Sequence, residues 1–166
     1  MSKEKQTYVA YVTYVQKKTN LWTYVLMSNE TEQMDVETII KITLDCANAV
    51  RKALAPGYLE KVYENALSIE LQNAGLDVKQ QFPISIYYKD VSVGDYVADM
   101  IINDALIVEL KAVKDISLAH EAQLVNYLTA TGIDDGLIIN FGNDDKIQIK
   151  RKYRVYRPPK NKTEET

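Results

Sequence analysis

The 166-residue chain has one cysteine and one histidine, and both scarcities exclude classes of site. Cys46 has no partner for an internal disulfide, so we expect a reducing cytoplasm and a packing role in the core. A structural zinc needs several Cys or His ligands, and His120 is the single histidine. No segment approaches the about 20 apolar residues that span a bilayer. We also expect no signal peptide, because no apolar stretch precedes a small-residue cleavage site.

What is present is ordinary for a globular protein, with 46% hydrophobic and 26% charged residues. The net charge of −3 hides an asymmetry: residues 1–145 carry 12 Lys and Arg against 21 Asp and Glu, whereas residues 146–163 carry eight basic residues and no acid. This basic strip could contact a nucleic-acid backbone, or it could be a solvated edge strand and tail. The candidate contacts are Lys150, Arg151, Lys152 and Arg154.

Residues 1–33 differ from the rest of the chain. Tyr-Val pairs recur there every three residues, which fits neither a helix nor a strand. We expect a poorly ordered N-terminal extension, or a start assigned too early, followed by a domain over residues 34–157 and a polar tail over residues 158–166.

From Asp35 onward the periodicity is clear. Asp35 can cap a helix whose apolar residues recur at helical spacing until Pro56-Gly57, and a second helix over about 58–73 stops at Gly75. Ser117 can cap a third helix that Gly132 ends. Strand-like segments are expected at about 77–88, 92–102, 105–113, 137–141 and 146–156. The order α-α-β-β-β-α-β-β predicts an α/β domain with a mixed sheet flanked by helices.

Two charged residues interrupt the apolar strand that begins at about residue 105. Glu109 and Lys111 share one face of this strand, and burying them costs several kcal/mol unless each has a partner or a metal. Asp99 comes level with Glu109 if the connecting loop has an odd number of residues, such as 103–105. Two carboxylates at that spacing could bind Mg²⁺ or Mn²⁺, with the lysine orienting water. A salt bridge between the lysine and either acid is the alternative.

The predicted helices add polar residues in unexpected places. Glu60 falls within about 40° of Leu67 and Leu71 on a helical wheel, so it lies on an apolar stripe. Tyr63 and Glu64 flank it. In the third helix His120, Gln123 and Tyr127 share an arc of about 60°. That arc could be plain solvent exposure, and His120 suits a surface or capping position better than a general base.

Several motifs together resemble the bacterial GxxExxY proteins, which are assigned to the PD-(D/E)XK nuclease superfamily. The resemblance covers roughly residues 35–152, and it begins with the Gly-x-x-Glu-x-x-Tyr signature at residues 57–63. Further matching segments are residues 94–99, 107–112, 120–128 and 140–142. Ala98 stands where the superfamily pattern has a proline, which removes no chemical group.

The resemblance implies a restriction-endonuclease-like fold and a metal-dependent nuclease of nucleic acid. It places Asp99 and Glu109 as ligands of Mg²⁺ or Mn²⁺ and Lys111 as the water-positioning base. It also implies Glu60 as a helical acid and Gln123 as a polar helix residue.

Tyr63 and Tyr127 are possible supporting residues. Because a fold does not determine a function, two alternatives stay open. One is a non-catalytic nucleic-acid or protein-interaction module on a nuclease-like scaffold, and the other is a small-molecule enzyme. The sequence leaves DNA against RNA and the oligomeric state undecided.

Overall fold

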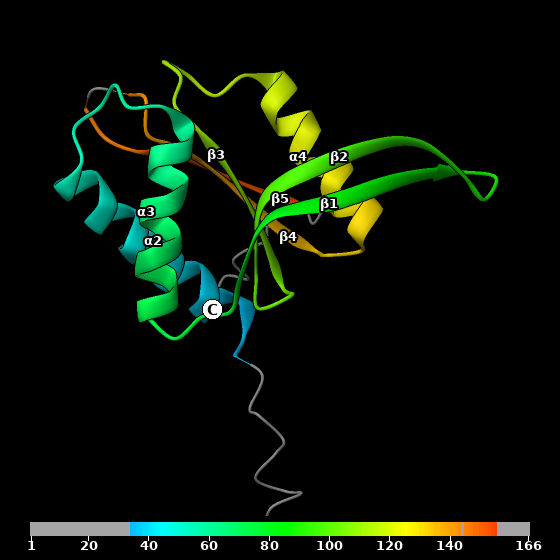
Figure 1. The fold of residues 1–166 in the computed structure, drawn as a ribbon, viewed down its shortest axis with the longest axis horizontal. Helices are drawn as coiled ribbons and strands as arrows, with labels where there is room; N and C mark the ends of the chain where they lie inside the picture. Colours follow the sequence, from blue (N-terminus) through cyan, green and yellow to red (C-terminus); the bar gives the residue numbers. More distant parts are fainter. Residues whose placement is uncertain (1–33, 144, 156–166) are drawn as a thin grey trace, which may run out of the picture. The chain divides into compact units, whose positions relative to one another are not determined.

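The computed structural model describes residues 34–143 and 145–155 (Figure 1). The expected N-terminal extension and polar tail lie outside these residues. The elements are α2 (Val36–Ala53), α3 (Glu60–Asn73), β1 (Val78–Tyr88), β2 (Val91–Ile102), β3 (Leu106–Lys111), α4 (Leu118–Thr131), β4 (Asp135–Asn140) and β5 (Gln148–Tyr153). Their order is the predicted one. No helix in the described ranges is long and apolar enough to cross a membrane.

The five strands form one mixed sheet in the order β1-β2-β3-β4-β5. β3 and β4 are parallel and the other neighbours are antiparallel. A parallel pair needs a crossover connection, which α4 provides. Figure 1 shows α2 and α3 on one side of the central strands and α4 on the other. The predicted fold class, a mixed sheet flanked by helices, is confirmed.

Short polar signals set the helix ends. The side chain of Asp35 accepts hydrogen bonds from the backbone N–H and the hydroxyl of Thr38. At the start of α4, Ser117 accepts from the backbone of His120, while His120 Nδ1 accepts from the backbone N–H of Ser117. This reciprocal pair is a capping box, so His120 has the capping role that the sequence favoured. Cys46 is buried, as expected.

The central strand β3 is shorter than the predicted segment. Its apolar residues are completely buried, and it pairs with β2 through a three-residue loop, residues 103–105, which has the predicted odd length. β3 ends at Lys111. Beyond it, the side chain of Asn140, at the end of β4, forms hydrogen bonds with the backbone of Val113. The Asn140 side chain accepts from Val113 N–H at 3.0 Å and donates to Val113 C=O at 2.7 Å.

Gly142 completes this clamp on the segment after β3. A Cβ atom at this position would overlap backbone atoms of Ala112 and Val113, so only glycine allows the two segments to come this close. The clamp matters for function because it determines where the chain leaves β3, directly after Glu109 and Lys111.

We predict that Gly142→Ala lowers the free energy of unfolding by about 2 kcal/mol or more, because rigid backbone must shift to admit the methyl group. Gly94→Ala is the matched control. Its Cβ would meet a Tyr96 ring atom at 3.7 Å, an ordinary contact, so its stability should stay nearly unchanged. Urea unfolding of both variants measures the difference, and equal midpoints would contradict the clamp.

Candidate active site

Asp99 and Glu109 lie opposite each other where the pairing of β2 with β3 stops. The last paired residues are Met100 and Val108, and one further step in that register brings Asp99 level with Glu109. Each carboxylate accepts a backbone hydrogen bond from the neighbouring strand. Glu109 Oε1 accepts from Asp99 N–H at 3.3 Å, and Asp99 Oδ2 accepts from Leu110 N–H at 2.8 Å. The side chains thus replace the backbone acceptors of the interrupted ladder.

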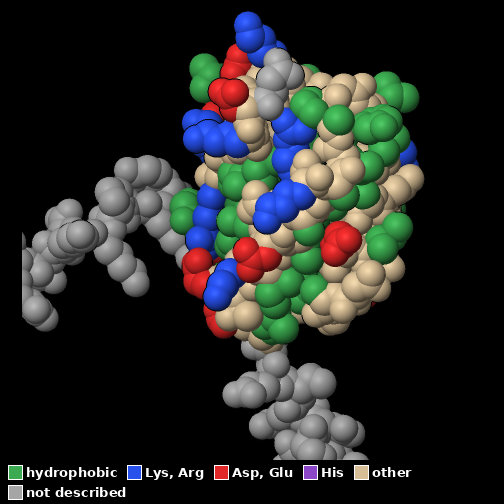
Figure 2. All heavy atoms as spheres, turned by 90° about the vertical axis from the view of Figure 1, so that its left-hand side faces the viewer, with side chains coloured by type: hydrophobic (Ala, Val, Ile, Leu, Met, Phe, Trp, Pro, Cys, Tyr) green, Lys and Arg blue, Asp and Glu red, His purple; other side chains and the backbone are tan. Residues whose placement is uncertain are grey.

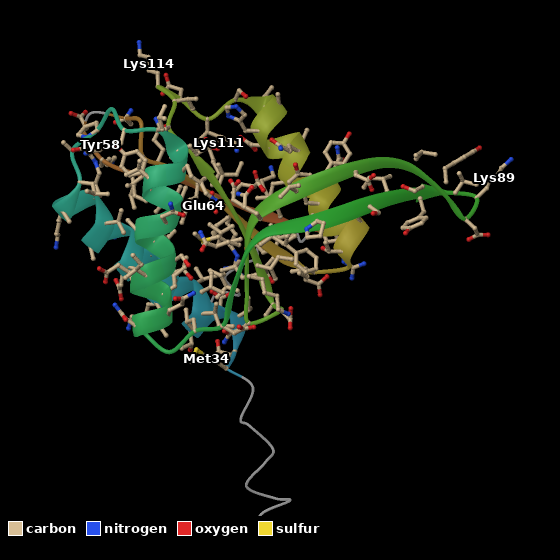
Figure 3. All side chains as sticks on the ribbon, viewed as in Figure 1. Met34, Tyr58, Glu64, Lys89, Lys111 and Lys114 are labelled. Carbon is tan, nitrogen blue, oxygen red and sulfur yellow. The ribbon has the colours of Figure 1, made fainter. Side chains whose placement is uncertain are left out.

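Lys111 lies against both carboxylates. Its Nζ is 3.2 Å from Glu109 Oε2 and 4.0 Å from Asp99 Oδ2. The three side chains are 12%, 3% and 16% exposed for Lys111, Glu109 and Asp99 respectively, so they form a shielded cluster with a small opening to solvent. Figure 3 shows Lys111 at the end of β3, between α3 and α4.

The charges in this cluster shift one another's pKa values. Burial, and then the charge of Asp99, raise the pKa of Glu109 to about 7, although Lys111 opposes the shift. Burial also raises the pKa of Asp99. Burial acts to lower the pKa of Lys111, but the combined charges of Glu109, Glu60 and Asp99 outweigh it and the pKa is raised. Burial is thus the main reason that the pKa values of both acids are raised, and the charge of Lys111 does not fully offset it.

Glu60, at the first turn of α3, faces this cluster. Burial raises its pKa; the charge of Lys111 and a hydrogen bond from the Ala112 backbone lower it, and the charge of Asp99 raises it. These effects indicate that the Glu60 carboxylate lies near the end of β3.

Glu64 is a second acid from α3, which the sequence identified only as a neighbour of Glu60. Its carboxylate is almost completely buried, since the side chain is only 3% exposed. Oε1 accepts from Lys61 Nζ at 2.7 Å and from Gln80 Nε2 at 3.0 Å, and Oε2 accepts from Gln81 Nε2 at 3.0 Å. Spacing of i, i+4 from Glu60 was the available signal. The two glutamines could not be found this way, because they come from β1.

Tyr63 is completely buried below the loop that precedes α3. Its hydroxyl donates to Ala55 C=O at 2.7 Å and accepts from Tyr58 N–H at 3.2 Å, and its ring stacks on Phe141. These contacts hold the chain entering α3. Tyr63 therefore supports the position of Glu60 through the backbone.

Gln123 and Tyr127 lie together on α4, where Gln123 Nε2 donates to Tyr127 Oη at 2.7 Å. Burial raises the pKa of Tyr127, the hydrogen bond from Gln123 lowers it, and the charge of Glu109 adds to the increase. Both residues also line a hollow of about 880 Å³ between α4 and the β1–β2 hairpin. The other walls of the hollow include Tyr87, Gly94 and Tyr96, and none of the residues that line it is charged.

The basic residues of β5 do not form one surface. Lys150 and Lys152 pair with Glu121 of α4 at 3.9 and 2.8 Å. Arg151 points to the other layer, where it forms two hydrogen bonds with Glu37 of α2 and two with Asp135. Strand alternation separates them.

Arg154, just beyond β5, pairs with Asp134 at 2.9 Å. Figure 2, which views the molecule from the α2–α3 side, shows side chains of both charges among apolar and uncharged ones.

The donor set fits a small divalent cation. Mg²⁺ usually binds through one or two carboxylates and keeps several waters. Asp99 and Glu109 supply two carboxylates whose pKa values are raised mainly by burial and further by the charge of nearby acids, and a bound cation would offset both effects. Within residues 34–143 and 145–155, no group of three or more His, Cys, Asp or Glu side chains is arranged to hold a metal ion.

Comparison with known proteins identifies the fold family. A family model described as the PD-(D/E)XK nuclease superfamily matches residues 37–152. The narrower GxxExxY resemblance stays a prediction. A solved structure titled "Crystal structure of SSO0001" is similar at 19% identity and a TM-score of 0.45, over 56% of this chain and 48% of that one, so the match spans about half of the solved chain. No curated protein matches significantly.

We predict that the free energy of unfolding falls as the pH rises from about 4.5 to about 7. The folded-state pKa of Glu109 lies above its ordinary 4.5, so the folded protein retains this proton longer than the unfolded chain. The resulting stability is complete below about pH 4.5 and is lost as the pH rises through about 7. A shift of this size corresponds to about 3 kcal/mol.

Glu109→Gln should remove this part of the decline, as measured by urea unfolding at successive pH values with a chelator present. Glu121→Gln is the control. The hydrogen bond from Lys152 lowers the pKa of Glu121, so that residue contributes stability that is lost as the pH falls. An unchanged profile in Glu109→Gln would contradict the assignment.

Proposed function

The chain belongs to the PD-(D/E)XK nuclease superfamily, and we propose that it is a nuclease that hydrolyses phosphodiester bonds with Mg²⁺ or Mn²⁺. The observation that carries the proposal is the cluster of Asp99, Glu109 and Lys111, which joins two under-compensated carboxylates to an ammonium group at an opening to solvent. A structural salt bridge alone would need only one of the two acids.

Asp99 and Glu109 would hold the cation through their carboxylate oxygens. Both already have one oxygen held by a backbone amide, which limits their rotation. When bound, the cation would polarise a phosphoryl oxygen and lower the pKa of a coordinated water.

Lys111 would orient the attacking water and balance the negative charge that grows on the phosphate. Glu60 faces Lys111 and would help keep its ammonium directed at the opening. Gln123 and Tyr127 would orient water or a phosphate oxygen from α4, while Tyr63 would act only by supporting the start of α3.

Nucleic acid would enter along the uncharged hollow beside α4. Exposed Tyr96 and Tyr87 offer faces on which bases could stack, and such stacking is tolerant of sequence. Lys150 and Lys152 lie on the α4 side and are the basic residues best placed for the phosphate backbone. Arg151 and Arg154 would contribute mainly through their ion pairs. The proposal includes a cytoplasmic location and a functional domain over residues 34–157.

A second candidate is a non-catalytic nucleic-acid or protein-interaction module on the same scaffold. The outer half of the β1–β2 hairpin favours it, because apolar and aromatic side chains are exposed there on both strands. They include Tyr87, Tyr88, Val91 and Val93. Cleavage of nucleic acid separates this module from the nuclease.

We predict that the wild-type protein cleaves plasmid DNA, single-stranded DNA or RNA with Mg²⁺ or Mn²⁺ and not with EDTA. Lys111→Ala should lower turnover by about 100-fold or more, the usual size of an acid–base contribution, with little change in substrate affinity. Asp99→Asn should abolish cleavage and weaken Mn²⁺ binding.

Lys79→Ala is the matched control. Lys79 pairs with Asp104 on the surface, in the turn between β2 and β3, and is not part of the acid–lysine cluster. Circular dichroism should show that all variants are folded. Absence of metal-dependent cleavage of every substrate would overturn the nuclease proposal and leave the interaction module and the small-molecule enzyme.

We predict that Lys150→Gln with Lys152→Gln weakens nucleic-acid binding and reduces the slope of log affinity against log salt by up to about two units. Glu121→Gln should do the opposite, since it releases both lysines. Fluorescence anisotropy over a salt series measures the slope. Equal slopes for the three proteins would exclude these lysines from the contact.

A further inference from the structure

We propose that Gln81 is a positioning residue that holds Asp99 and Glu64 in one arrangement through its side-chain amide. The inference rests on the proposed function, because it assigns a role around the same site. Gln81 lies on β1, whereas the residues of the acid–lysine cluster lie on β2 and β3.

The backbone of Gln81 is unusual for a residue within a strand. Its φ is 50°, in the left-handed region that costs a non-glycine residue about 1 kcal/mol or more. Among the described non-glycine residues, the others with positive φ are Lys89, Asp90, Asn103 and Asp104, and all four belong to hairpin turns. Gln81 serves no turn, so the strain needs another explanation.

The strained residue lies opposite Asp99. Gln80 pairs with Met100, and Phe82 pairs with Ala98, so the register places Gln81 against Asp99, although these two are not paired themselves. The left-handed backbone interrupts the β1–β2 ladder at the one step where Asp99 is located. The interruption turns a side chain of β1 toward the acids.

The amide of Gln81 reaches two carboxylates from two different elements. Its Nε2 donates to Glu64 Oε2 of α3 at 3.0 Å and to Asp99 Oδ1 of β2 at 3.5 Å. One amide nitrogen carries two hydrogens, so it can donate to both carboxylates at the same time, with the bond to Asp99 the longer of the two. Because Leu110 N–H holds Asp99 Oδ2, the Gln81 bond means that both Asp99 oxygens have a donor.

A neutral amide suits this position physically. Asp99 and Glu64 repel each other, since the charge of Glu64 contributes to the raised pKa of Asp99. A lysine or arginine between them would cancel the negative charge that a cation requires. The amide instead holds the two groups in place and adds no net charge.

Gln80 supplies a matched control. Its Nε2 donates to Glu64 Oε1 at 3.0 Å and has a longer contact with Asn65, and no bond to Asp99 is found. Gln80→Ala therefore removes the bond to Glu64 and the longer contact with Asn65, and leaves the contacts of Asp99 in place. Gln81→Gly removes the bonds to both acids and keeps the left-handed backbone without strain.

The experiment measures Mn²⁺ affinity by calorimetry and the separate kcat and KM values for nucleic-acid cleavage. Loss of a residue that supports a metal ligand typically costs 10- to 100-fold in affinity or activity. Gln81→Gly should weaken Mn²⁺ binding and lower kcat by about tenfold or more with KM nearly unchanged, whereas Gln80→Ala should change neither. Equal losses in the two variants, or none in Gln81→Gly, would overturn the inference.

A separate readout keeps the inference apart from the proposed function. Asp99→Asn should shift the side-chain amide resonances of Gln81 in NMR spectra of the metal-free protein, and unshifted resonances would overturn the contact. A wild type that neither binds Mn²⁺ nor cleaves would overturn the nuclease proposal, and this NMR result would still decide the contact. Gln81→Asn, which suits the same backbone but has a side chain one methylene shorter that withdraws the amide from the two carboxylates, replaces Gln81→Gly if that variant does not fold.

Discussion

Three charged side chains at the end of the β2–β3 pairing are the constraint on which the rest of the structure depends. Asp99 and Glu109 accept the backbone bonds that the ladder leaves unmade, and Lys111 supplies the nearest positive charge. Such a group is costly inside a protein unless its surroundings are rigid. The clamp from Asn140, the loop held by Tyr63 and the buried Glu64 all supply that rigidity.

Rigidity here comes from several independent elements. α3 contributes Glu60 and Glu64, β1 contributes Gln81, and β4 fixes the exit of β3 through Asn140. The cluster itself comes from β2 and β3, whereas the residues that surround it lie up to 80 positions apart in the chain, from Glu60 to Asn140. The fold brings polar residues from α3, β1 and β4 together at one end of the sheet, while the apolar residues of the same elements form the core.

Sequence reasoning succeeded where short-range rules decide the outcome. Strand alternation placed Glu109 and Lys111 on one face, and loop parity brought Asp99 level with Glu109. It stopped short where contacts depend on tertiary geometry: nothing local marks Gln81 as left-handed. Strand alternation also implies that neighbouring basic residues of β5 point to opposite faces of the sheet, so the basic strip is not one surface. Arg151 accordingly faces Glu37, away from the two lysines.

The arrangement of β5 makes ionic strength a variable of the fold as well as of binding. This edge strand links α2 through Arg151 and α4 through Lys150 and Lys152, so both outer layers are fastened to it by charge. At about 0.1 M salt the screening length is about 10 Å, longer than these contacts, so the exposed pairs weaken appreciably only at higher salt. High salt therefore loosens the two attachments at once, and low salt holds the lysines to Glu121. An intermediate ionic strength would free the lysines while the better-shielded bond of Arg151 to Asp135 still secures the strand.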